Sequence, residues 1–181
     1  YTLSDTLSLH DALPILALRL VADVSLADPG LRRDRERADA LKRERETTAQ
    51  AFFEKNAAVW DSMRTLHISE DAVEAAMRDA LGAGPFKFFV DLGTGTGRTL
   101  ELFADTYARG LGIDVNQAML AYARAKLTTG GRTHAQVRHG DIYALSLADR
   151  QADGIVMHQV LHFLSDPQLA IREAARALAP G

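Results

Sequence analysis

The segment Asp91–Arg98, DLGTGTGR, constrains the fold more than any other part of the 181-residue chain. It follows an apolar run, FKFFV, that is typical of a buried strand, and it leads into a helical pattern over residues 97–108. Glycines in a strand-to-helix turn let the backbone bend sharply and let its N–H groups approach a ligand without interference from Cβ atoms. A dinucleotide fingerprint, G-x-G-x-x-G, would place its third glycine at position 98, where this chain has arginine. The loop therefore indicates a nucleotide-like cofactor and argues against a nicotinamide-dependent dehydrogenase.

Strand and helix patterns alternate from residue 86 onward. Further strands are predicted at residues 110–115, 135–141 and 152–160, and further helices at residues 116–127 and 165–179, the last followed by the stop signal Pro180-Gly181. Alternation of this kind predicts an α/β fold with a parallel sheet and right-handed crossovers.

An aspartate lies at the end of each of the first three predicted strands: Asp91, Asp114 and Asp141. Taken singly, each could cap a helix or occupy a turn, because aspartate is a preferred N-cap residue. The carboxyl ends of parallel strands share one edge, which is where open α/β sheets bind ligands. We therefore expect the three carboxylates and the glycine loop to form one site.

These motifs resemble those of class I S-adenosylmethionine-dependent methyltransferases. D-x-G-x-G-x-G matches motif I of that family, and GIDV (residues 112–115) and GDI (residues 140–142) match later segments in the family's order. The resemblance covers residues 49–181 and, more narrowly, extends to type 11 methyltransferase domains of the kind fused behind ArsR-type winged-helix regulators. It implies a Rossmann-like fold with strand order 3-2-1-4-5-7-6, truncated here after the fourth strand and its helix, with an N-terminal helical segment.

The resemblance also implies S-adenosyl-L-methionine as the cofactor. Asp114 would accept from both ribose hydroxyls, Asp141 from the adenine amine, and Asp91 would help to hold the methionine end directly or through water. His158 would lie beside the sulfonium. The implied cofactor-binding residues are Asp91, Gly93, Thr94, Gly95, Gly97, Asp114, Val115, Asp141, Ile142 and His158. No catalytic residue is implied, because catalysis in such enzymes is mostly alignment of the acceptor with the methyl group.

His158 and His162 have the i, i+4 spacing of a metal pair. No third ligand at a matching spacing accompanies them, so no metal site is expected. The alternative for His162 is a packing or capping position in the turn after the fourth strand.

The chain before the glycine loop divides into three segments. Thr6–Ile15 resembles the translation of a sequencing adapter, so residues 1–15 are expected to be a non-native scar. Residues 16–48 are interpreted as a charged linker helix, with a dimerisation seam, and hence a homodimer, as the alternative. Residues 49–84 are expected to form a helical lid before the incomplete methyltransferase domain of residues 85–181, with Phe52, Phe53, Ala57, Val59 and Trp60 as its apolar anchors.

Composition bears on three further questions: nucleic-acid binding, cysteine chemistry and membrane association. The net charge of −3 provides no positive field for nucleic acid, so DNA binding is expected only through an upstream domain that this sequence does not contain. Cysteine is absent, which excludes thiolate chemistry and the cysteine-dependent activity of arsenite methyltransferases. No apolar run is long enough to span a membrane, and a cytoplasmic location is expected.

Two functions follow from the sequence. The first is methyl transfer to a small-molecule acceptor by the complete protein, of which this fragment alone would bind the cofactor weakly or not at all. The alternative is a ligand-sensing domain of an ArsR-type DNA-binding regulator.

Overall fold

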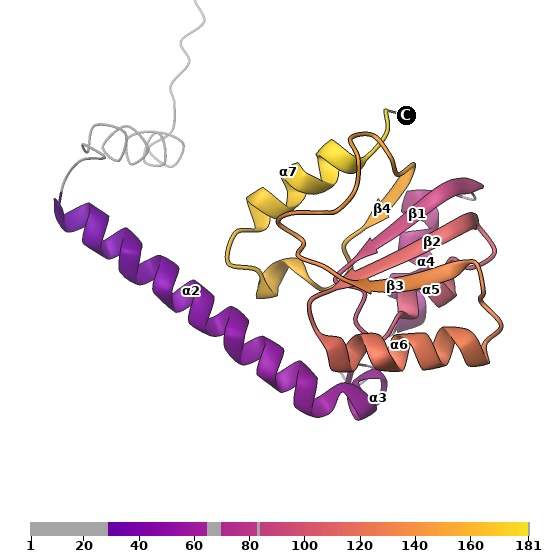
Figure 1. Ribbon diagram of the computed structural model, residues 1–181, viewed down its shortest axis with the longest axis horizontal. Coiled ribbons are helices and arrows are strands. Elements are labelled where there is room, and N and C mark those ends of the chain that lie inside the picture. The colour runs from indigo at the N-terminus through magenta and orange to yellow at the C-terminus, as the bar shows by residue number, and fades with distance from the viewer. Residues whose placement is uncertain (1–28, 65–69, 83, 181) are drawn as a thin grey trace, which may run out of the picture. The chain divides into compact units, whose positions relative to one another are not determined.

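The computed structural model describes residues 29–64, 70–82 and 84–180. The chain divides into two compact units, residues 1–42 and residues 43–181. The elements, in chain order and with the labels of Figure 1, are α2 (Pro29–Asn56), η1 (Ala57–Val59), α3 (Trp60–Arg64), α4 (Glu70–Leu81), β1 (Phe86–Leu92), α5 (Arg98–Leu102), β2 (Tyr107–Asp114), α6 (Gln117–Thr129), β3 (Ala135–His139), β4 (Gly154–Val156), η2 (Leu161–Phe163) and α7 (Pro167–Ala177).

The four strands form one parallel sheet in the order β3-β2-β1-β4. This order is the first part of the order that the resemblance implies, and it confirms the predicted α/β class. β1 lies in the interior of the sheet and pairs with β2 along most of its length, from Phe86↔Tyr107 to Leu92↔Ile113. The carboxyl ends of the strands consequently meet at one edge.

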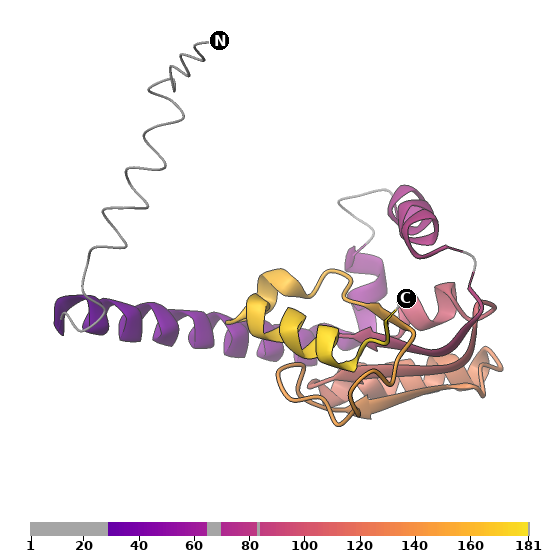
Figure 2. The same ribbon diagram turned by 90° about the horizontal axis from the view of Figure 1, so that it is seen from above.

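Helices cover both faces of the sheet, and the alternation of side chains along β1 explains how. Phe88, Val90 and Leu92 point into one core, which α7 closes with three alanines. Phe89 points into the other core, beneath α5 and α6. Figure 1 shows α7 and α6 on opposite sides of the sheet, and Figure 2 shows the same layers from above.

Several element boundaries differ from the sequence prediction. The helix after the glycine loop ends at Leu102 and not at residue 108, and β2 begins already at Tyr107. Tyr107 causes this early start: its ring stacks on Phe89 at 5.4 Å between centroids, and its hydroxyl donates to the Leu100 carbonyl at 2.8 Å. β3 ends at His139, and β4 covers only Gly154–Val156.

The region before the sheet also differs in detail. One continuous helix, α2, runs through residue 48, where sequence analysis placed the start of a second helix. Ala57 is buried as predicted, whereas Phe52 and Val59 are 45% and 50% exposed, so these two are not anchors. Residues 1–15 and residues 16–28 of the proposed 16–48 linker lie outside the described residues.

Candidate functional site

A cavity opens at the carboxyl ends of the strands. Of the ten residues that the resemblance implies for the cofactor, eight line this cavity, namely Gly93, Thr94, Gly95, Asp114, Val115, Asp141, Ile142 and His158. Asp91 and Gly97 are not among its lining residues.

The glycine loop lines the cavity with backbone that carries no side chain at Gly93 and Gly95. Gly93, Gly95 and Gly97 have φ angles of 73°, 53° and 80°, a region in which side-chain-bearing residues are strained. A Cβ at Gly93 would overlap the Val160 side chain, while a Cβ at Gly95 would meet nothing within 4 Å. The open space at Gly95 is the point where a ligand can approach the backbone.

Asp114, at the end of β2, faces the glycine loop. Its Oδ2 accepts from the Gly95 N–H at 2.8 Å, and its Oδ1 accepts from the Asn116 N–H at 2.8 Å. Burial raises the pKa of Asp114 above its ordinary value, and these backbone hydrogen bonds oppose the rise. Each oxygen keeps a lone pair, so the carboxylate can still accept from two ligand hydroxyls.

Asp141 lies in the loop that follows β3. Its Oδ1 accepts from the Tyr143 N–H at 2.8 Å, and its side chain is exposed, whereas Ile142 is 7% exposed. Oδ2 has no hydrogen-bond partner among the described residues, so it is available to an amine donor. Asp141 and Asp114 thus line the same cavity from neighbouring strands, as the sequence predicted.

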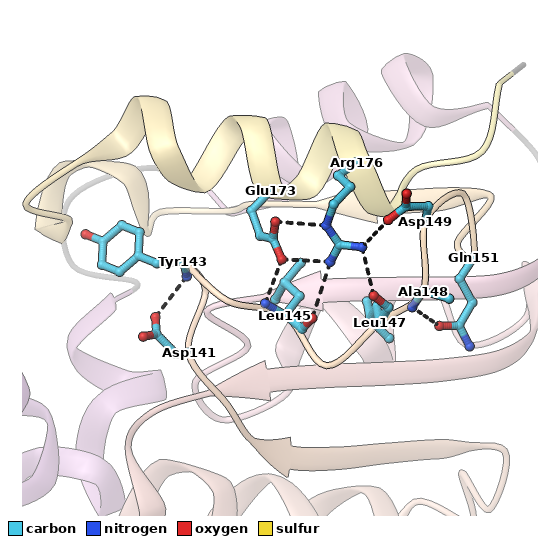
Figure 3. Close-up of polar contacts among 9 residues, drawn as sticks. All are labelled: Asp141, Tyr143, Leu145, Leu147, Ala148, Asp149, Gln151, Glu173 and Arg176. Atoms are coloured by element: carbon cyan, nitrogen blue, oxygen red, sulfur yellow. Dashed lines mark hydrogen bonds and ion pairs between the residues drawn. The ribbon is translucent and has the colours of Figure 1, made fainter.

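A network from α7 holds the loop that begins at Asp141 (Figure 3). Arg176 donates to the Leu147 carbonyl at 2.9 Å and to the Leu145 carbonyl at 3.3 Å, and it pairs with Asp149 at 2.6 Å. Glu173 joins the network, since its carboxylate accepts from both Arg176 and the Leu145 N–H. Glu173 and Arg176 thus attach this loop to α7, while its apolar residues Ile142, Leu145 and Leu147 belong to the core cluster that includes Leu92 and Ile113.

Asp91 lies beneath the glycine loop, not in the cavity. It is 1% exposed, and its Oδ2 accepts from the Thr94 hydroxyl at 2.6 Å. Burial raises its pKa from 3.8 to about 7, the hydrogen bond from Thr94 lowers it, and the nearby Asp114 carboxylate raises it further. Asp91 can therefore act on a ligand through Thr94, which does line the cavity.

Gly97 allows the start of α5 to pack closely against α6. It is the N-cap of α5, and a Cβ there would lie 3.2 Å from the Cβ of Ala123 on α6. The absence of a side chain lets the start of α5 approach α6, which positions the loop before it.

Sequence analysis missed several residues around the cavity. Asn116 lines it and caps α6, with its side chain accepting from the Met119 N–H at 3.1 Å. The sequence could have predicted this cap, because asparagine is a preferred N-cap residue and Asn116 stands at the start of the predicted helix. Glu46 and Gln50 of α2 also line the cavity, and the Gln50 carbonyl accepts from the Asn116 amide at 3.1 Å. No local pattern could indicate this contact, because 66 residues separate the two partners.

A second long-range attachment involves Asp61 of α3. Its carboxylate accepts from the Thr96 hydroxyl at 2.6 Å and from Lys126 at 2.8 Å. The helical segment before the sheet is thereby joined to the glycine loop and to α6.

The residues present fit S-adenosylmethionine. A carboxylate with two available lone pairs suits a ribose diol, an exposed carboxylate suits an exocyclic amine, and bare backbone suits a close approach without a phosphate cradle. Arg98, the cationic side chain of the described lining, forms a bidentate pair with Glu74 at 2.7 and 2.9 Å. Within the described ranges, no three His, Asp or Glu side chains gather as a metal site. Nor does any described helix have the length and apolar character needed to cross a membrane.

Comparison with known proteins gives a consistent result. The family model described as "Methyltransferase domain" matches residues 90–181, about half of the chain. A protein of Mycolicibacterium smegmatis named "Probable S-adenosylmethionine-dependent methyltransferase" is 33% identical over 92 residues, which cover 51% of this chain and 34% of that protein. An uncharacterized 37.1 kDa protein in transposon TN4556 of Streptomyces fradiae is 37% identical over 111 residues, covering 60% of this chain and 32% of that protein.

A solved structure shares the fold. It is described as "Complex between the Haloferax volcanii Trm112 methyltransferase activator and the putative methyltransferase". One chain of this complex matches the present chain with a TM-score of 0.58 and 30% identity. The match covers 71% of this chain and 56% of that chain. The present chain spans about a third of the length of the two curated relatives described above.

Proposed function

We propose, since this chain belongs to the methyltransferase domain family, that the complete protein transfers a methyl group from S-adenosylmethionine to a small-molecule acceptor. One observation carries the proposal: Asp114, Asp141 and the bare backbone of Gly93–Gly95 line a single cavity at the carboxyl ends of the strands. When bound, S-adenosylmethionine would supply an electrophilic methyl group for in-line attack by the acceptor.

The chain's own residues have separate tasks in this proposal. Asp114 orients the ribose, and Asp141 with the Ile142 backbone orients the adenine. Thr94, supported from below by Asp91, limits where the methionine end can lie. His158 and Gln159 lie just beyond β4 and line the cavity, where they would contact the methyl group or the acceptor. Gln159 has a left-handed φ of 53°, which is strained for a residue with a side chain and is a feature that functional sites retain.

The experiment is a transfer assay on the complete protein. The protein is incubated with methyl-tritiated S-adenosylmethionine and a low-molecular-weight cell extract, and tritium is measured in the products that pass an ultrafilter. We expect labelled small molecules, and we expect the Asp114→Asn variant to lose at least about tenfold of the rate, because a charge-assisted contact to the ribose is lost.

The alternative, ligand sensing by a DNA-binding regulator, predicts a different outcome. The complete protein would then bind S-adenosylmethionine without labelling any extract component, and its binding to DNA would change with the ligand. The names of the relatives favour methyl transfer, because the Mycolicibacterium smegmatis protein is named for that activity.

A further inference from the structure

Three aromatic rings line one part of the cavity, and the ring of Phe53 contacts each of the other two edge to face. The rings of Phe53 and Trp60 are 4.9 Å apart at 86°, and those of Phe53 and Phe163 are 4.9 Å apart at 85°. The three side chains, called here the aromatic wall, are each only partly exposed. Phe163 joins the wall from a position 110 residues further along the chain than Phe53, so the wall forms only in the folded protein.

Phe163 brings the aromatic wall to the part of the cavity that follows β4. Phe163 lies on η2, directly after His158, Gln159 and Val160. The proposed adenine and ribose contacts, Asp141 and Asp114, follow β3 and β2 on the other side of β1. Phe163 therefore lies on the β4 side of the cavity, across β1 from the two carboxylates assigned to the nucleoside, and its contact with Phe53 brings the wall to that side.

The charges around the cavity disfavour an anionic occupant. Glu46, Asp114 and Asp141 contribute three carboxylates to the lining. Arg98, its one lysine or arginine among the described residues, is held by both oxygens of Glu74. Among the described lining residues, a carboxylate or phosphate on the acceptor would meet Glu46 and the two aspartates but no lysine or arginine other than the paired Arg98.

We infer that Phe53, Trp60 and Phe163 form the acceptor subsite, and that the acceptor presents a neutral, planar aromatic group to it. Aromatic rings arranged edge to face offer both ring faces and ring edges, which planar π-systems contact more favourably than saturated rings do. This inference rests on the proposed function and adds the chemical class of the acceptor.

The test uses the one tryptophan of the chain as a reporter. Trp60 gives a single indole N–H signal in a ¹H–¹⁵N spectrum, and the 181-residue chain is titrated with 2-naphthol, with its anionic counterpart 2-naphthoate and with its saturated counterpart 2-decalol. We expect saturable shifts of the indole signal with 2-naphthol, and binding weaker by about tenfold or more for 2-naphthoate and weaker for 2-decalol.

Two aromatic-to-leucine variants locate the binding. Phe163→Leu removes a ring of the aromatic wall but keeps an apolar side chain, and should weaken 2-naphthol binding about three- to tenfold. Tyr122→Leu is the control, since Tyr122 is 46% exposed on α6 and is not part of the cavity lining. Its affinity for 2-naphthol should equal that of the unchanged chain.

The same samples are titrated with S-adenosylhomocysteine, read at the Gly95 amide, to separate the two proposals. Binding of 2-naphthol to the chain, together with no binding of S-adenosylhomocysteine by the complete protein, would leave the subsite standing and remove the proposed function. Equal affinity for 2-naphthol and 2-naphthoate would overturn the inference, even if Phe163→Leu failed to fold. So would a Phe163→Leu variant that loses S-adenosylhomocysteine binding and keeps 2-naphthol binding, because the rings would then serve the cofactor.

Discussion

At the scale of single residues, the two carboxylates at the ends of β1 and β2 differ in surroundings and hence in task. Asp114 is held by two backbone N–H groups at the cavity, whereas Asp91 is enclosed under the loop with the Thr94 hydroxyl as its hydrogen-bond donor. Burial raises the pKa of both, and for Asp91 the value reaches about 7. Asp91 thus supports the glycine loop through Thr94, and its burial makes ionisation of its carboxyl group unfavourable in the folded chain.

This predicts how the stability of the chain depends on pH. Between pH 3.8 and about pH 7 the unfolded chain ionises Asp91 while the folded chain keeps it protonated, so the free energy of unfolding should fall as the pH rises through this window. Asp91→Asn removes this dependence and keeps an oxygen to accept from Thr94. The variant should be more stable at pH 8, by up to about 4 kcal/mol, with the difference disappearing below about pH 4.

Urea unfolding of both chains at several pH values measures the effect. Asp105→Asn is the control, because that side chain is exposed and should leave the pH profile unchanged. Parallel stability profiles for the unchanged chain and Asp91→Asn would show that Asp91 ionises as freely in the folded protein as in the unfolded chain.

Much of the residue-level site was predictable, and its limits have a physical cause. Asp114, Asp141 and the glycine loop could be identified because each follows its own strand, and parallel strands end at one edge. The burial of Asp91 and the packing of Gly97 against Ala123 depend on which neighbours the fold supplies, which local patterns do not record.

At the scale of elements, α7 holds the loop that carries Asp141. Arg176 bonds two carbonyls of that loop and pairs with Asp149, so one side chain links the helix to the segment after β3 (Figure 3). Arg176→Ala should release the loop. We expect the Leu145 amide, which donates to Glu173, to exchange its hydrogen roughly tenfold faster, and the affinity for S-adenosylhomocysteine to fall.

Arg172→Ala provides the comparison on the same helix, because Arg172 is exposed and takes no part in this network. Hydrogen exchange should be unchanged in that variant. Unchanged exchange at Leu145 in Arg176→Ala would mean that the loop is held by other contacts.

Element types were easier to predict than element ends. The alternation of apolar runs and helical patterns indicated β1 to β4 and the helices α5, α6 and α7 correctly, whereas the short helix η2 was not predicted. The early start of β2 could not be read locally, because it follows from Tyr107 stacking on Phe89 of the neighbouring strand.

At the scale of the whole unit of residues 43–181, the sheet order β3-β2-β1-β4 agrees with the order expected for the family. The contacts of the preceding helices with the site were not predictable in detail. Gln50 with Asn116, Asp61 with Thr96 and Phe53 with Phe163 join positions far apart in sequence, and only the folded sheet brings them together.

The most direct test of the account is a ¹H–¹⁵N titration of the chain with S-adenosylhomocysteine, which detects even weak binding. We expect saturable shifts concentrated at the amides of Gly93–Gly95, Val115–Asn116 and Ile142–Tyr143, and their loss in Asp114→Asn. Shifts of the chain confined to residues away from this cavity, or spectra of the complete protein that stay unchanged at millimolar ligand, would contradict the assignment of the site.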